Sequence, residues 1–282
     1  PGANVGSLTI TNDPGGALGG ILPYAIANNS ATATATNTFV RWNGANGRIE
    51  ALNLATDYQT GGLPTYLNTN STAQYRQGFI QNGLNGTTTV NSLILETNEA
   101  AAQFIGNAVA GAGTLRISSG AFMSTLVGGA TAGTVAPTVA VGTLDFGANP
   151  GYIHTPPSVL ITSNITGSGG LVRSGGGALF LFGDNAFTGH LYSQFGNIVF
   201  DRDVTLGAAS NEVRLNAAQT GMFLLPYPLY TTGATNSVTT ARNFVIGEGG
   251  GGITVANATG TYTITGNLSG TGNLGKVGGG TL

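Results

Sequence analysis

Two aspartates, Asp201 and Asp203, are the closest match to a catalytic carboxylate pair in the sequence. Glycoside hydrolysis needs two carboxyl groups that flank the scissile bond. Residues at i and i+2 share one face of a strand, so these two could cooperate, while Arg202 between them would point the other way. The competing interpretation is a solvated strand end before a strand at residues 204–206, and we favour it. We therefore predict no catalytic residue and no enzymatic activity.

The two histidines and the glycine tracts do not match a metal or phosphate site. His154 and His190 lie far apart, and neither has a second His or a carboxylate at ligand spacing. His154 precedes Thr-Pro-Pro and is expected in a loop. The tracts at 175–177 and 249–252 are not followed by the Lys-Ser/Thr and helix of a P-loop. We expect no metal and no cofactor.

Partner recognition is the remaining chemistry, and an apolar segment at residues 221–232 is the best candidate for it. Pro226 and Pro228 forbid a central strand here, so we expect a flap that leaves the fold. Left exposed, the flap would be an unusual apolar patch, and folded back it would cover a sheet edge. Both readings stay open. The candidate contact residues are Phe223, Leu224, Leu225, Tyr227, Leu229 and Tyr230.

A second aromatic group could bind or cleave glycans, the alternative to a purely structural role. It combines Trp42 and Arg41 with three tyrosines, Tyr58, Tyr66 and Tyr75, all of them inside a Tyr- and Gln-rich segment with Pro64. We expect this segment, residues 56–82, to be a loop insertion. The sequence does not show whether these side chains meet.

Composition excludes several classes of protein. Only 7% of the 282 residues are charged and the net charge is −2, which argues against nucleic-acid binding, since that requires a basic stripe. The absence of cysteine excludes disulfides, a thiol nucleophile and a Cys-based zinc site. The sequence contains no run of 18 apolar residues, so it predicts no membrane-spanning helix. With 41% hydrophobic residues the chain can nevertheless build a long core.

Short alternating runs punctuated by glycine predict the elements that must position these side chains. Runs such as SLTIT, ALFLF and TYTIT are about five residues long and are bounded by Gly, Asn or Asp, as in short strands joined by tight turns. Residues 165–179 (ITGSGGLVRSGGGAL) are repeated at 268–282 (LSGTGNLGKVGGGTL). A repeat of this kind favours a solenoid, with about four coils per repeat, over a β-sandwich. In such a solenoid we expect Asn185 to belong to a stacked amide ladder.

The stretch 165–200 resembles the autotransporter-associated β-strand repeat of bacterial surface proteins, as found in very long planctomycete-type chains. The resemblance rests on Gly167 to Leu171, on the basic Arg173, and on a Gly-x-Asn-x-Phe-Thr-Gly run at 183–189. It departs from that pattern at residues 190–192, where His-Leu-Tyr replaces Gly-Gly-Thr, so the coil edge there is expected to differ. The resemblance implies export, a β-helical passenger and a cell-surface role, and it implies no catalytic residues.

We therefore predict an all-β fold, a right-handed parallel β-helix (β-solenoid) with irregular loop insertions. One continuous solenoid is expected, with modules at 1–90, 91–206 and 207–282, as a fragment of a longer chain. The predicted function is that of an extracellular structural or adhesive surface protein, an adhesin passenger segment that assembles into a fibre or surface layer. The expected partners are neighbouring coils, copies of the same chain, or a cell-surface glycan, with no nucleic acid and no membrane span.

Overall fold

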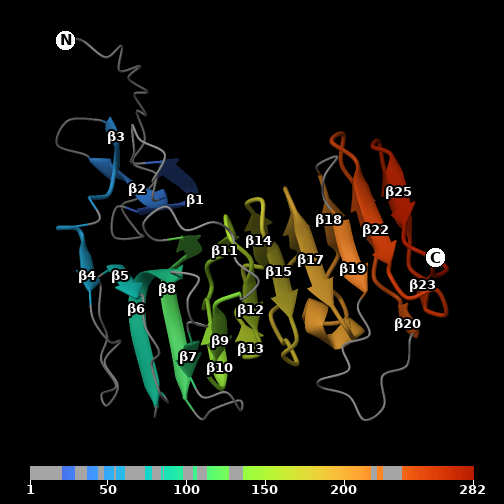
Figure 1. Ribbon diagram of the computed structural model, residues 1–282, viewed down its shortest axis with the longest axis horizontal. Coiled ribbons are helices and arrows are strands. Elements are labelled where there is room, and N and C mark those ends of the chain that lie inside the picture. Colours follow the sequence, from blue (N-terminus) through green and yellow to red (C-terminus); the bar gives the residue numbers. More distant parts are fainter. Residues whose placement is uncertain are drawn as a thin grey trace.

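The computed structural model is an all-β chain whose strands stack in parallel to form a β-solenoid (Figure 1). It describes residues 21–28, 37–43, 48–53, 55–60, 74–77, 84, 86–97, 104–106, 113–126, 136–216, 221–224 and 237–282. Within these ranges the only regular helix is the short 3-10 helix η2 (Asp203–Leu206), and no helix is long and apolar enough to cross a membrane. The predicted parallel β-solenoid is confirmed, while its right-handed winding stays a prediction.

The solenoid has three faces, each built from strands of successive turns. The first face contains β4 (Tyr58–Thr60), β5 (Gln74–Gln77), β6 (Thr87–Thr97), β8 (Thr114–Leu126), β11 (Gly151–His154), β14 (Leu171–Ser174), β16 (Leu191–Ser193), β18 (Val213–Leu215), β21 (Phe244–Ile246) and β24 (Leu268–Gly270). The second face contains β7 (Phe104–Gly106), β9 (Thr138–Ala140), β12 (Val159–Ile161), β15 (Ala178–Leu181), β17 (Asn197–Phe200), β19 (Gly221–Leu224), β22 (Gly251–Val255) and β25 (Leu274–Val277).

The third face is less regular than the other two. It contains β10 (Thr143–Asp145) and β13 (Asn164–Thr166), then a segment at Asn185 without strand structure, then η2, and finally β20 (Ser237–Thr240) and β23 (Thr261–Ile264). Six successive turns therefore run from β10 to β25, each crossing the third, first and second faces in that order. Two of these turns lack a strand on the third face and need another source of hydrogen bonds.

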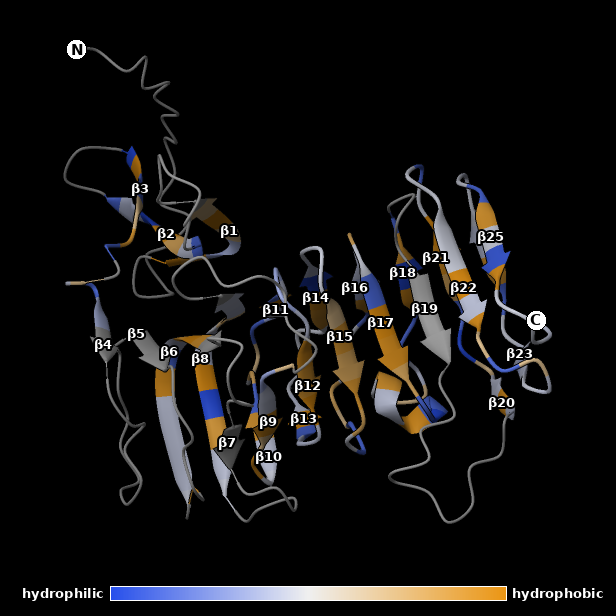
Figure 2. Cartoon of the chain, in the orientation of Figure 1, coloured by the Kyte–Doolittle hydropathy of each residue, from blue (hydrophilic) through white to orange (hydrophobic). Residues whose placement is uncertain are grey.

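Stacked apolar columns fill the inside of the solenoid. On the first face Leu171, Leu191, Val213 and Phe244 lie in register on successive turns and are at most 1% exposed. Burying a side chain of this size contributes about 1.5–3 kcal/mol, so each turn gains from both of its neighbours. The second face shows the same alternation, with apolar stretches on β15 and β17 (Figure 2).

A separate antiparallel sheet lies against the outside of the first face. It consists of β1 (Ile21–Asn28), β2 (Asn37–Asn43) and β3 (Arg48–Ala51), within the range 1–90 that the sequence assigns to a solenoid module (Figure 1). Its Ile21 and Phe39 form a second buried cluster with Ile94, Ala121 and Met123, which point outward from β6 and β8. We call these three strands the covering sheet.

The two sequence copies of the repeat do not occupy equivalent positions in the solenoid. Leu171 of the first copy lies on the first face, whereas its counterpart Leu274 lies on the second face, in β25. Leu268, four rungs along from Leu171, is the residue that continues its column. Turn lengths differ because loops of different length join the strands, so the repeat spans four turns and one further face.

Both predicted loop insertions begin with strands. β4 and β5 lie within residues 56–82 and pair with each other, and β5 pairs with β6. In the apolar segment, Phe223 and Leu224 belong to β19, whose backbone pairs with β17 and β22, so this part of the predicted flap does not leave the coil. The prolines that prevent a strand stand only at 226 and 228, after β19 has ended.

Candidate functional site

An outward column of residues on the first face gathers aromatic and charged side chains. Tyr152, Val172, Tyr192 and Arg214 are in register on four successive strands, β11, β14, β16 and β18. Their neighbours along each strand, such as Ile153 and Leu191, are fully buried, because alternate residues of a strand point to opposite faces. The four side chains therefore line the outer surface in a row along the solenoid axis.

Arg214 holds the charged end of this row in a fixed geometry. Its Nε donates to Glu212 Oε1 at 2.5 Å and its Nη1 donates to the Tyr192 hydroxyl oxygen at 3.1 Å. The guanidinium carbon also lies 5.2 Å from the centre of the Tyr192 ring, within cation–π range. Arg214 is 38% exposed and Glu212 21%, so the pair is ordered and yet open to solvent.

His190 completes this group from the turn before β16. Its ring meets the Tyr192 ring edge-on with centroids 5.8 Å apart, its Nε2 lies 3.5 Å from Arg214 Nη2, and its Nδ1 lies 3.9 Å from Glu212 Oε1. Because an arginine N–H can only donate, Nε2 is the acceptor in this contact.

The other end of the row is aromatic. Tyr152 stands edge-on to Tyr24 of β1, with ring centroids 5.9 Å apart and an interplanar angle of 64°. Burial, followed by the nearby Tyr24 and Tyr192 hydroxyls, raises the pKa of Tyr152, so its phenol stays neutral at physiological pH. We call Tyr24, Tyr152, His190, Tyr192, Glu212 and Arg214 together the tyrosine–arginine surface.

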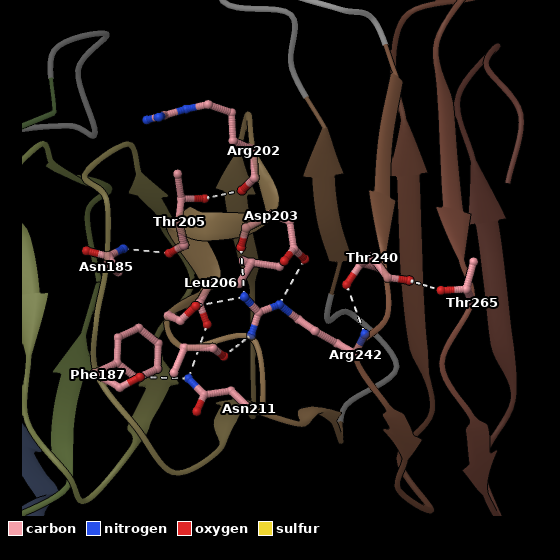
Figure 3. Close-up of polar contacts among 12 residues, drawn as sticks. Asn185, Phe187, Arg202, Asp203, Thr205, Leu206, Asn211, Thr240, Arg242 and Thr265 are labelled. Atoms are coloured by element: carbon pink, nitrogen blue, oxygen red, sulfur yellow. Dashed lines mark hydrogen bonds and ion pairs between the residues drawn. The ribbon is translucent and has the colours of Figure 1, made fainter.

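The two aspartates that were weighed as a catalytic pair, Asp201 and Asp203, both contact arginines. Residues 203–206 form η2 instead of the expected strand, and the Asp203 carboxylate faces Arg242 at 2.9 Å (Figure 3). Arg242 is 2% exposed and also donates to the carbonyl oxygens of Gly207 and Asp203, so the ion pair ties β20 to η2. Asp201 pairs with Arg202. Both aspartates therefore have structural partners.

Asn185 lies on the third face in a turn that has no strand there, and its amide bonds to the backbone of the adjacent turns and not to stacked amides, as the predicted ladder would have it. Its Oδ1 accepts from the Ile165 backbone N–H at 2.7 Å. Its Nδ2 donates to the Thr205 carbonyl oxygen at 2.5 Å (Figure 3). The side chain is 3% exposed and bridges the turns on either side. Asn211 acts similarly, donating to the Phe187 carbonyl at 2.9 Å. Buried amides thus supply hydrogen bonds that the irregular face lacks.

Arg173, the basic residue of the repeat, points into the core. It is fully buried, donates from Nη2 to Thr155 Oγ1 at 2.9 Å, and has no partner for Nε or Nη1 among the described residues. Burial lowers its pKa to about 10, which leaves it charged at neutral pH. Ser193 on the next rung also has an unpartnered hydroxyl. Arg173 is therefore a core residue and not part of an outer binding surface.

His154 is not in the expected loop. It ends β11, is 5% exposed, and its Nε2 lies 2.8 Å from the Pro23 carbonyl oxygen of β1, while Nδ1 contacts the Ser174 hydroxyl. Burial lowers its pKa below the usual 6.5. Among the described residues no group of three or more His, Asp or Glu side chains could hold a metal ion.

The residues expected to recognise a partner or a glycan are only partly described. Leu225, Tyr227, Leu229 and Tyr230 lie outside the described residues, and Phe223 and Leu224 are described by backbone alone, so their contact role stays a prediction. Tyr66 also lies outside, and Tyr75 is described by backbone alone.

One member of the proposed aromatic cluster near Trp42, Tyr58, is buried in the core. Tyr58 is 6% exposed and its hydroxyl contacts Thr38 Oγ1 at 3.1 Å and the Phe39 backbone N–H at 3.2 Å. Arg41 lies 3.5 Å from Asp57 and 3.8 Å from Glu50. Tyr58 is thus unavailable as a platform for a ligand.

The tyrosine–arginine surface was not predicted, although one signal pointed to part of it. The departure from the repeat pattern at 190–192 places His190 and Tyr192 where the pattern has Gly and Thr. No such signal marks Tyr152 or Arg214. They lie in register with Tyr192 only because of the lengths of the segments that join successive strands of the first face.

Comparison with known proteins connects this solenoid to a bacterial adhesin. The chain is 32% identical over 218 residues to the adhesin BmaC autotransporter of Brucella suis biovar 1 (strain 1330). The similarity covers 72% of this chain but spans only 6% of the adhesin's length. No protein-family model matches the chain, and no solved structure matches it.

Proposed function

Since the chain is a β-helix of the autotransporter passenger type, we propose that it is an adhesive, non-enzymatic segment of a protein displayed on a bacterial cell surface. The observation that carries this proposal is the similarity of most of the chain to an autotransporter adhesin, together with the stacked parallel turns. The pairing of Asp201 and Asp203 with arginines supports the non-enzymatic part.

Adhesion can be measured with beads that carry the full chain. Coated beads should attach to cultured epithelial cells in larger numbers than beads coated with albumin, and soluble chain should compete with them. Equal attachment of both kinds of bead would reject the adhesive role. Release of reducing ends from polysaccharides by the wild-type chain, abolished by Asp203→Asn, would reject the non-enzymatic part.

Assembly of such segments into a fibre or surface layer is the finer form of the proposal. It is supported by the geometry of the turns, in which every strand on the first face from β5 to β21 pairs in parallel with both neighbours. A solenoid of this kind grows by adding turns, within one chain or between copies. Sedimentation of the purified chain should then show species that lengthen with concentration, whereas a single monomeric species would leave the passenger without a fibre role.

A further inference from the structure

The spacing of the two tyrosines on the outer row suits a linear ligand. Tyr152 and Tyr192 stand two rungs apart, with Val172 between them, which separates their Cα atoms by about 10 Å. This is close to the length of two pyranose units in a linear polysaccharide. Because the row follows the stacking direction, a chain lying along the axis would meet one aromatic ring per two sugar units.

Both tyrosine rings are half-buried and therefore held in place. Tyr152 is fixed by Tyr24, and Tyr192 is fixed by the ring of His190 and by Arg214. Aromatic side chains supply large contact area at a low entropy cost, and their apolar faces match the C–H faces of sugar rings. A row of fixed rings is a preorganised platform.

The polar groups beside Tyr192 suit hydroxyl ligands. Arg214 supplies N–H donors and Glu212 supplies carboxylate acceptors, and the ion pair between them at 2.5 Å fixes both. Each sugar hydroxyl can donate and accept, so a fixed donor next to a fixed acceptor can bind two vicinal hydroxyls.

Charge selects among possible polymers. The positive charge of Arg214 is balanced by Glu212 at the same place, and the whole chain has a net charge of −2. Polyanions such as nucleic acids or sulfated glycans bind basic stripes, which release counterions. The described residues of this row form no basic stripe, so the balanced charges of Arg214 and Glu212 favour an uncharged polymer.

We infer that the tyrosine–arginine surface binds a neutral polysaccharide chain that lies along the solenoid axis and stacks on Tyr152 and Tyr192. The inference rests on the proposed adhesive function and gives it a ligand class. The ligand contacts are made by the tyrosine rings and by the Arg214–Glu212 pair, and no bond is broken.

Binding can be tested on the full chain with defined oligosaccharides. The neutral probes are cellohexaose, maltohexaose and mannohexaose, and the acidic probe is hexagalacturonate, each titrated in a calorimeter and followed by saturation-transfer NMR. At least one neutral probe should bind, with hexagalacturonate at least tenfold weaker. Saturation transfer should reach the C–H protons of the sugar rings.

Variants locate the site. Tyr192→Ala should weaken binding of the neutral probe about tenfold, since a stacked ring accounts for roughly that factor. Tyr192→Phe keeps the ring and should retain most of the affinity. Phe195→Ala is the matched control, because Phe195 is an exposed aromatic outside the row, at 42%, and its loss should leave binding unchanged.

The outcomes separate the ligand class from adhesion itself. The inference is overturned if no neutral probe binds, if hexagalacturonate binds best, or if Tyr192→Ala binds as tightly as the wild type. Attachment of coated beads to cells in the absence of oligosaccharide binding would remove the ligand class and leave the adhesive function standing. Binding of oligosaccharide without attachment to cells would remove the adhesive function and leave the ligand class standing.

Discussion

The outer side of the first face is covered over β6 and β8 and open over β16 and β18. One outward column runs through both regions, from Ala121 under the covering sheet, through Tyr152 at its edge against Tyr24, to Tyr192 and Arg214 beyond it. In the covered region outward residues such as Ile94 and Met123 are apolar and fully buried. In the open region Tyr192 and Arg214 are aromatic or charged and half-exposed.

The covered and the open part of the first face differ in whether their outward side chains need to be shielded from water. Apolar outward residues require a cover, and β1 to β3 supply it with Ile21 and Phe39. Aromatic residues with a polar tip tolerate water while keeping an apolar ring available. The covered region therefore contributes stability, and the open region is free to bind a ligand.

The largest expected effect lies under the covering sheet. Met123→Ala removes a fully buried side chain and should lower the free energy of unfolding by about 2–5 kcal/mol. Val172→Ala, in the open region, should cost less than about 1 kcal/mol. Urea unfolding followed by Trp42 fluorescence reports this directly, because the single tryptophan lies in β2. Equal losses of unfolding free energy in the two variants would show that the covered region is not more important for stability than the open region.

An intermediate effect is expected from His154, which joins the covering sheet to the solenoid through Pro23. Its pKa is lowered in the folded state, so the unfolded state binds more protons between that pKa and 6.5. Stability is then complete above pH 6.5 and falls as the pH drops below it, by at most about 1.4 kcal/mol per pH unit.

The pH dependence can be measured as the urea midpoint of Trp42 fluorescence between pH 7.5 and pH 5. His154→Gln keeps a polar side chain but cannot titrate, so it should remove most of the slope in this window. A slope that persists in His154→Gln would assign the pH effect to other groups.

The smallest effect on stability is expected from the open region. Arg214→Ala breaks a solvent-exposed ion pair and a cation–π contact, and should lower the free energy of unfolding by at most about 1 kcal/mol. The urea midpoint of the Trp42 transition should therefore shift far less than in Met123→Ala. A loss as large as that of Met123→Ala would mean that the tyrosine–arginine surface holds the fold together and is not free for a ligand.

Sequence reasoning was most reliable where one residue type has one physical use. The alternating runs and glycine turns predicted short strands and the repeat predicted a parallel solenoid, whereas Asn185, expected in a stacked amide ladder, bonds through its amide to backbone groups of both neighbouring turns. It was wrong for His154, where a following Thr-Pro-Pro suggested a loop although the residue ends β11 under the covering sheet.

The sequence by itself determined that this chain stacks short strands around an apolar interior, because period-two alternation leaves one side of every strand apolar. Only the tertiary structure decided which residues meet on the outside. Because the turns differ in length, Leu274 lies on a different face from its repeat counterpart Leu171. For the same reason Tyr152, Tyr192 and Arg214 lie in one row. Register between distant strands depends on the loops that separate them, and no local pattern records it.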